Sequence, residues 1–161
     1  MPYVWIVLSS LFVDQVSKWF VRDYMELGES VQISGNIFRL TYIHNPGAAF
    51  GFNLGSPLLH TVLSILALGV LIFVFANLSE NEMLRRCALC LVLGGALGNI
   101  VDRIYLGEVV DFFDVGWGEL RWPIFNFADA FVTIGVFILI FHPNKDKKET
   151  DDTSNSYDSN N

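Results

Sequence analysis

Aspartates beside apolar runs are the residues of this sequence with the clearest capacity for chemistry. Asp102, Asp111 and Asp129 follow one another in the stretch from residue 94 to residue 129, which contains GGALGNIVDR, VVDFF and FNFAD in turn. A charge in or against hydrocarbon is costly, so an ionisable side chain in such a place indicates a functional site. We therefore expect a membrane enzyme whose chemistry uses carboxylates.

Two aspartates are enough to hydrolyse a peptide bond without a metal or a covalent nucleophile. When two carboxyls share one proton, one can accept a proton from water while the other donates to the carbonyl or to the leaving amine. No GxSxG motif, Ser-Lys pair or Cys-His arrangement competes with them. The three histidines are too scattered for a zinc site. We expect no metal, no cofactor and no nucleic-acid partner.

Further polar residues sit at helical spacing near these aspartates. Asp14 and Lys18 are four residues apart and share one helix face, which predicts either a structural ion pair or a direct role towards substrate. Asn99, Asp102 and Arg103 share a face of a later helix. A carboxylate fixed by an adjacent guanidinium stays ionised and makes a poor proton shuttle, which favours a structural role for Asp102.

The residues around the other two aspartates leave alternatives open. Composition does not choose between Asp111 and Asp114, since both lie beside phenylalanine and other apolar residues. Asn126 and Asp129 are spaced as the N-cap and N3 residues of a helix, so a helix cap is one interpretation. A membrane span that reaches back to about Pro123 would place Asp129 roughly 9 Å inside its outer boundary, and this depth in the membrane favours a functional role.

A turn of small residues, His44 to Gly51, separates the first two predicted helices. It reads HNPGAAFG, and its glycines allow backbone conformations closed to other residues. It is either a tight connection back into the membrane, or a place where the Asn45 amide and the backbone near Gly47 face an extended peptide.

The composition is that of one small membrane domain, residues 1–144, with a disordered cytoplasmic tail, residues 145–161. The chain has 161 residues, of which 52% are hydrophobic and 17% charged, and its mean hydropathy is +0.43. The tail is polar and acidic and lacks aliphatic residues. Apolar runs of about 20 residues predict four transmembrane helices, at Pro2–Val21, Pro57–Leu78, Leu84–Tyr105 and Ile124–His142.

The predicted fold is an all-α membrane protein of four transmembrane helices, with a small extracytoplasmic β-hairpin or sheet between the first and second. The turn signal Ser34-Gly35-Asn36 lies between two runs of strand-forming residues. Basic residues orient the helices with both termini in the cytoplasm; they are Arg85, Arg86, Lys145, Lys147 and Lys148. Counted from the cytoplasmic ends, the intramembrane polar residues converge near the extracytoplasmic face.

Five blocks of the sequence resemble lipoprotein signal peptidase, also called signal peptidase II. They are DQVSK from residue 14, NPGAAF from residue 45, GGALGNIVDR from residue 94, VVDF from residue 109 and FNFAD from residue 125. The blocks run in order from the first predicted helix to the fourth, and only the tail lies outside them. Any one block is a weak signal, whereas all five in order are highly specific.

The resemblance implies a bacterial inner-membrane aspartic endopeptidase that removes the signal peptide from prolipoproteins by cleaving before the diacylglyceryl-modified cysteine. The family's catalytic pair corresponds to Asp111 and Asp129. Positions that line the substrate and inhibitor site correspond to Asn45, Asn99, Arg103 and Asn126. Positions tied to structure or stability correspond to Asp14, Lys18 and Asp102. The implied partners are diacylglyceryl-modified prolipoproteins, membrane lipid and globomycin-type inhibitors.

A small ion-coupled membrane carrier is the alternative function, because a buried pair of carboxylates can also relay protons. Two observations weigh against it. The polar residues occupy one side of the predicted membrane region, and the sequence shows no inverted repeat.

Overall fold

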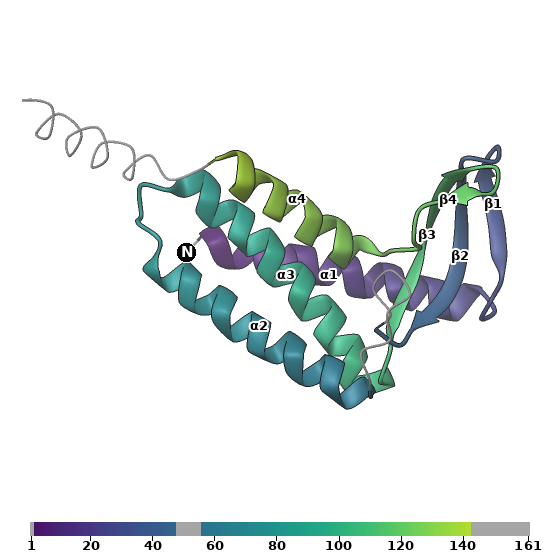
Figure 1. The fold of residues 1–161 in the computed structure, drawn as a ribbon, viewed down its shortest axis with the longest axis horizontal. Coiled ribbons are helices and arrows are strands. Elements are labelled where there is room, and N and C mark those ends of the chain that lie inside the picture. Colours follow the sequence, from purple (N-terminus) through teal and green to yellow (C-terminus); the bar gives the residue numbers. More distant parts are fainter. Residues whose placement is uncertain (1, 48–55, 143–161) are drawn as a thin grey trace, which may run out of the picture.

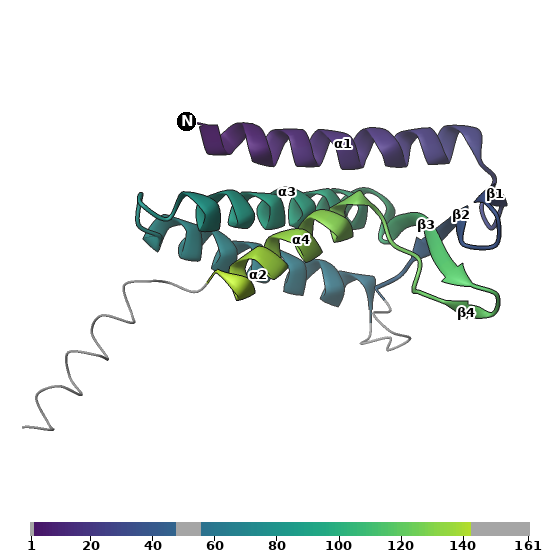
Figure 2. The same cartoon turned by 90° about the horizontal axis from the view of Figure 1, so that it is seen from above.

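The helix α3 (Met83–Leu106) is the centre of the molecule. The computed structural model describes residues 2–47 and 56–142. In it, α3 packs against α1 (Pro2–Tyr24), α2 (Pro57–Asn77) and α4 (Phe127–Phe141), with α1 on one side and α2 and α4 on the other (Figures 1 and 2).

Glycines let the neighbouring helices approach α3 closely, and Gly94 and Gly98 have the small-xxx-small spacing that favours such packing. A Cβ atom on Gly94 would lie 2.7 Å from the Ser10 Cβ atom of α1. A Cβ atom on Gly95 would meet the carbonyl oxygen of Ala128 in α4. Because the glycines lack side chains, the polar faces of α1, α3 and α4 pack directly against one another.

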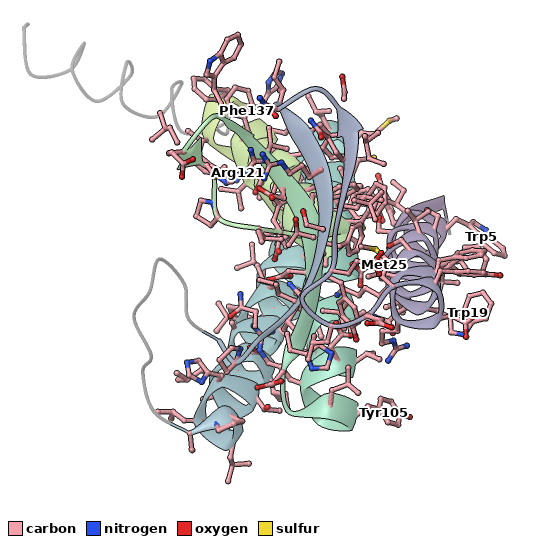
Figure 3. All side chains as sticks on the ribbon, turned by 90° about the vertical axis from the view of Figure 1, so that its right-hand side faces the viewer. Trp5, Trp19, Met25, Tyr105, Arg121 and Phe137 are labelled. Carbon is pink, nitrogen blue, oxygen red and sulfur yellow. The ribbon has the colours of Figure 1, made fainter. Side chains whose placement is uncertain are left out.

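Three helices, α1, α2 and α3, are long and apolar enough to cross a membrane. On the outer side of α1, Trp5 and Trp19 project away from the other helices (Figure 3), and their side chains are largely exposed. This exposure suits a surface that faces lipid. The helix α4 has only 15 residues, which corresponds to a length of about 22 Å.

The helix α4 begins later than the sequence predicted. We expected it to start near Ile124, with Asp129 about two turns inside, but it starts at Phe127 and Asp129 lies in its first turn. The reason is that Phe125 pairs with the sheet instead: the Phe113 amide donates to the Phe125 carbonyl at 2.7 Å, and the Phe125 amide donates back at 3.1 Å.

The fold is not purely α-helical, because a four-stranded antiparallel sheet of order β1-β2-β3-β4 closes one end of the bundle (Figure 1). The predicted hairpin is confirmed as β1 (Ser30–Ser34) and β2 (Phe38–Asn45). The connection between α3 and α4 adds β3 (Val109–Trp117) and β4 (Leu120–Arg121), which we did not predict. The sheet is therefore built from both connections, and β3 carries Asp111 to the end of the helices.

The start of α1, the turn between α2 and α3, and the end of α4 lie together at the end of the bundle opposite the sheet (Figure 1). This arrangement brings Arg85 and Arg86 to the end opposite the sheet. The predicted tail and its lysines, residues 145–161, fall outside the described residues, and so does the second half of the turn from residue 48 to residue 51.

Candidate functional site

A buried ion triad joins α1 to α3 at the base of the site. The Lys18 side chain is 0% exposed, and its ammonium lies 2.9 Å from a carboxylate oxygen of Asp14 and 2.9 Å from one of Asp102. The predicted pair of Asp14 and Lys18 is therefore confirmed. The expected pairing of Asp102 with Arg103 is wrong: within residues 2–47 and 56–142, Asp102 forms its ion pair with Lys18 instead.

The two aspartates of this triad also hold neighbouring backbone in place. Asp14 accepts a hydrogen bond from the Ala128 amide at 2.9 Å, and Asp102 accepts one from the Val110 amide at 3.1 Å. Gln15, whose importance the sequence did not indicate, donates to both of these carboxylates. The first turn of α4 and the start of β3 are thus fixed to the same buried charges.

Lys18 also sets the orientation of Asn99. Its ammonium donates to the Asn99 Oδ1 atom at 2.9 Å. An ammonium can only donate, so the oxygen of the Asn99 amide must face Lys18 and its amino group must face the other way. That amino group donates to the Asp129 Oδ1 atom at 2.8 Å.

Asn126 connects the two aspartates of the candidate catalytic pair. It is completely buried and forms a capping box with Asp129: its Oδ1 atom accepts from the Asp129 amide at 2.9 Å, and the Asp129 carboxylate accepts from the Asn126 amide. The Asn126 Nδ2 atom donates to the Asp111 Oδ1 atom at 2.6 Å. The Asn126 side chain therefore both caps α4 and contacts Asp111. A helix cap and a role in the site are compatible for this residue.

Asp111 is enclosed by amide donors. Its side chain is 1% exposed, and its second oxygen accepts from the Asn45 Nδ2 atom at 2.9 Å. Burial, followed by the negative charge of Asp129, raises the pKa of Asp111 to about 7. The hydrogen bonds from Asn45 and Asn126 and the charge of Lys18 oppose this rise. Asp111 is thus a carboxyl that can hold a proton near neutral pH.

Asp114 lies outside this network, which favours Asp111 of the two carboxylates between which composition did not choose. In β3 it is three residues beyond Asp111, and side chains an odd number of residues apart in a strand point to opposite faces. Its carboxylate accepts from Arg121 and, at 2.9 Å, from Thr41. Asp114 therefore ties β2, β3 and β4 together instead of facing Asp129.

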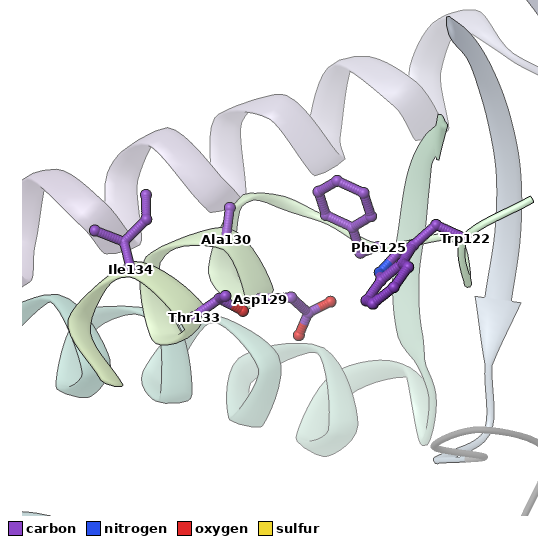
Figure 4. A pocket seen from close by; sticks show the side chains of 6 residues that line it. All are labelled: Trp122, Phe125, Asp129, Ala130, Thr133 and Ile134. Carbon is purple, nitrogen blue, oxygen red and sulfur yellow. The ribbon is translucent and has the colours of Figure 1, made fainter. Parts of the chain in front are cut away.

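An apolar recess of about 370 Å³ opens beside Asp129 (Figure 4). The Asp129 carboxylate points to the end of the recess at which Trp122 and Phe125 lie, while α4 forms the rest of the wall. We did not predict this recess, because apolar residues that line it cannot be told from lipid-facing ones by sequence alone.

The structure brings the predicted site residues together. Eight of them belong to one hydrogen-bonded network: Asp14, Lys18, Asn45, Asn99, Asp102, Asp111, Asn126 and Asp129. Gly47 joins through its amide, which donates to the Asn45 Oδ1 atom at 3.0 Å. Arg103 joins through a guanidinium that donates to the Asn99 carbonyl at 3.3 Å.

Comparison with known proteins shows the family of the chain. A family model described as signal peptidase (SPase) II matches residues 6–143, which is most of the chain. The chain belongs to the signal peptidase II family. A lipoprotein signal peptidase of Syntrophus aciditrophicus is 42% identical over 144 residues, covering 86% of this chain and 89% of the relative. One of Geobacter sulfurreducens is 42% identical over 138 residues, covering 83% and 86%.

The fold of this signal peptidase II family member is also similar to solved structures. A structure described as a bacterial membrane enzyme superposes with a TM-score of 0.79 at 32% identity, covering 96% of this chain and 90% of that chain. A second of the same description gives 0.78 at 33% identity, covering 87% and 90%. Membership of a peptidase family, together with several apolar helices, supports a multi-pass bacterial membrane peptidase and does not favour the ion-coupled carrier.

Proposed function

We propose that this protein removes signal peptides from prolipoproteins by cleaving before the diacylglyceryl-modified cysteine, with Asp111 and Asp129 activating water. The observation that carries the proposal is the bridge through Asn126, which caps Asp129 and donates to Asp111. One buried side chain contacts both residues, so their positions are fixed relative to one another. The negative charge of Asp129 raises the pKa of Asp111, so the two ionisations are coupled. This is the requirement for two aspartates that share one proton.

The environments of the two carboxyls suggest which one acts first as the base. Asp111 holds its proton near neutral pH because its pKa is about 7. Asp129 accepts hydrogen bonds from the Asn99 amino group and the Asn126 backbone amide, so both of its oxygens face donors and we assign it as the base. Asp129 then takes a proton from water as the water oxygen bonds to the scissile carbonyl carbon, and Asp111 donates its proton to the carbonyl oxygen. As the C–N bond breaks, the proton on Asp129 passes to the leaving amine, and the re-forming carbonyl group returns a hydroxyl proton to Asp111, which restores the starting state of the pair.

The pH dependence of cleavage follows from this assignment. Above about pH 7 Asp111 loses its proton, the pair carries two negative charges and the acid is gone, so kcat/KM should fall on the alkaline side with an apparent pKa near 7. In an Asn45→Ala variant the hydrogen bond that lowers this pKa is lost, so the alkaline limb should move to higher pH. A limb that is the same in both proteins would contradict the role of Asp111 as the acid.

The substrate's lipid is proposed to set the position of the scissile bond. The recess beside Asp129 has an apolar lining, which supports binding of the part of the substrate that is anchored in lipid. Acyl chains contribute about 0.8 kcal/mol per buried CH₂ to membrane partitioning, so diacylation holds the cysteine at a fixed depth. By the same family relationship we propose that globomycin-type cyclic peptides compete for this site.

An assay with purified protein tests the proposed function. The protein should shorten a diacylated prolipoprotein. The same prolipoprotein with an unmodified cysteine should be cleaved roughly 100-fold more slowly at matched concentration, because its scissile bond rarely lies at the depth of the aspartate pair. Absence of cleavage of the diacylated form would overturn the proposed function. Equal rates for the two forms would overturn the role of the lipid alone.

We further propose that residues 1–144 form one peptidase domain of four membrane-spanning helices in the inner membrane, with both termini cytoplasmic. Arg85 and Arg86 lie beside the turn between α2 and α3, opposite the sheet and the aspartate pair, and short basic turns favour the cytoplasmic side. Of two reporters fused to the carboxyl end, the one that works in the cytoplasm should be active and the one that works only outside the membrane should be inactive. The opposite result would contradict the proposed orientation and would place the aspartate pair on the cytoplasmic side.

A further inference from the structure

The imidazole of His60, in the first turn of α2, occupies the space beside Gly47. His60 is 9% exposed. Gly47 has φ +102°, and a Cβ atom on it would lie 2.6 Å from the His60 Cδ2 and Cγ atoms and 2.9 Å from its Nε2 atom. The ring therefore rests against the backbone of Gly47, and a side chain at residue 47 would collide with it.

A hydrogen bond to Ser56 fixes the His60 ring in this place. The His60 Nδ1 atom lies 3.2 Å from the Ser56 carbonyl oxygen, which only accepts, so Nδ1 is the nitrogen that carries the proton in the neutral ring. Ser56 is also the N-cap of α2, and its side chain accepts from the Leu59 amide. The ring is thus attached to the rigid start of α2.

Gly47, which His60 contacts, is linked to the aspartate pair through the side chain of Asn45. The Gly47 amide donates to the Asn45 Oδ1 atom at 3.0 Å, so the Asn45 amino group must point the other way, where it donates to the Asp111 Oδ2 atom at 2.9 Å. A change in the turn at Gly47 would release the Asn45 oxygen and allow its amide to rotate. The orientation of the donor to Asp111 therefore depends on what holds Gly47.

The simpler explanation is that His60 is a buried residue that only fills space at the start of α2. Two features argue for more than packing. The ring contacts Gly47, whose amide donates to the Asn45 Oδ1 atom. A glycine can leave its left-handed conformation easily, so a contact from outside the turn is needed to hold it there. In the part of the chain that the structure describes, the His60 Nε2 atom has no hydrogen-bond partner, so the ring is not held there by a second polar contact.

We propose that His60 is a positioning residue for peptide cleavage: its ring clamps the turn at Gly47 and thereby keeps the Asn45 amide directed at Asp111. This inference rests on the proposed function, in which Asp111 is the acid. His60 itself touches neither of the two aspartates through any hydrogen bond of the described residues.

The clamp is tested with His60→Ala and His60→Phe, with His142→Ala as the matched control because the His142 side chain is exposed at the far end of α4. His60→Ala should lower kcat/KM for the diacylated prolipoprotein about 10- to 100-fold and move the alkaline limb to higher pH, as Asn45→Ala does. His60→Phe keeps a ring against Gly47 and should recover most of the activity. His142→Ala should behave as the parent protein.

The double variant Asn45→Ala/His60→Ala gives the sharpest result. Because both changes act on the same hydrogen bond, the double variant should be no less active than Asn45→Ala alone. Multiplied losses in the double variant, or a His60→Ala protein with normal activity and an unmoved alkaline limb, would overturn the clamp while leaving the proposed function intact. A parent protein that fails to cleave the substrate would instead overturn the proposed function. Infrared titration of Asp111 then tests the clamp without activity: the pKa should rise in folded His60→Ala protein and stay near that of the parent in His60→Phe, and an unchanged pKa in folded His60→Ala protein would reject the clamp.

Discussion

Asp111→Asn and Asp129→Asn should each lower kcat by about 100- to 10,000-fold, which is the contribution that general acid or general base catalysis typically makes. Each change keeps the size of the side chain and removes a carboxyl that can carry the shared proton. An amide at residue 129 still offers an oxygen to the Asn126 amide, so the capping box retains an acceptor and α4 should still begin at Phe127. Cleavage of the diacylated prolipoprotein measures the loss, and thermal unfolding in detergent checks that both variants are folded.

Two control variants separate a loss of chemistry from a loss of structure. Asp23→Asn removes an exposed carboxyl near the end of α1 and should leave both activity and stability unchanged. Asp114→Asn weakens the contacts with Arg121 and Thr41 but leaves the network at Asp111 in place, so it should lower the unfolding temperature and remain active. Substantial turnover by folded Asp111→Asn or Asp129→Asn would contradict the assignment of the pair.

Lys18→Met should destabilise the protein by about 3–5 kcal/mol, because it leaves two buried carboxylates without their counter-ion. Lys18 is the cation that contacts Asp14 and Asp102, and all three side chains are almost completely buried. The change also frees the Asn99 Oδ1 atom, so the amide that donates to Asp129 loses its fixed orientation. We expect both a large fall in the unfolding temperature and a loss of activity in whatever protein remains folded.

A second variant tells a charge effect from a packing effect. Asp14→Asn/Lys18→Met leaves one buried charge where Lys18→Met leaves two, so it should recover part of the lost stability although it carries more changes. Thermal unfolding of the two variants in the same detergent gives the comparison. If the double variant is less stable than Lys18→Met, uncompensated charge is not the main cause of the loss.

The local parts of the site could be predicted because they follow from spacing along one element. Asp14 and Lys18 are four residues apart on a helix, and Asn126 and Asp129 occupy the N-cap and N3 positions, so each pair meets without help from the rest of the fold. The hairpin turn at residues 34–36 is local in the same sense. The spacing of Gly94 and Gly98 in α3 is likewise a local feature that favours close helix packing.

The remaining parts depend on contacts between distant segments. The pairing of β2 with β3 joins residues about 70 positions apart, and contacts of this range leave no periodic signal in either segment. Phe125 is apolar enough to belong to a helix, and only its backbone pairing with Phe113 shows that it does not. The true partner of Asp102 is likewise on another helix, whereas the adjacent Arg103 suggested a local pair.

Titration of the Asp111 carboxyl, in the parent protein and in Asp129→Asn, tests most directly whether the two aspartates act as a coupled pair. Infrared spectroscopy of the carboxyl band, with Asp111→Asn to identify the signal, gives the pKa of Asp111 without any substrate. In the parent protein it should be about 7, because burial and the negative charge of Asp129 both raise it. In Asp129→Asn the second cause is gone, so the pKa should fall. A pKa that is the same in the two proteins would show that the carboxyls are not coupled, and would contradict a shared proton as the basis of cleavage.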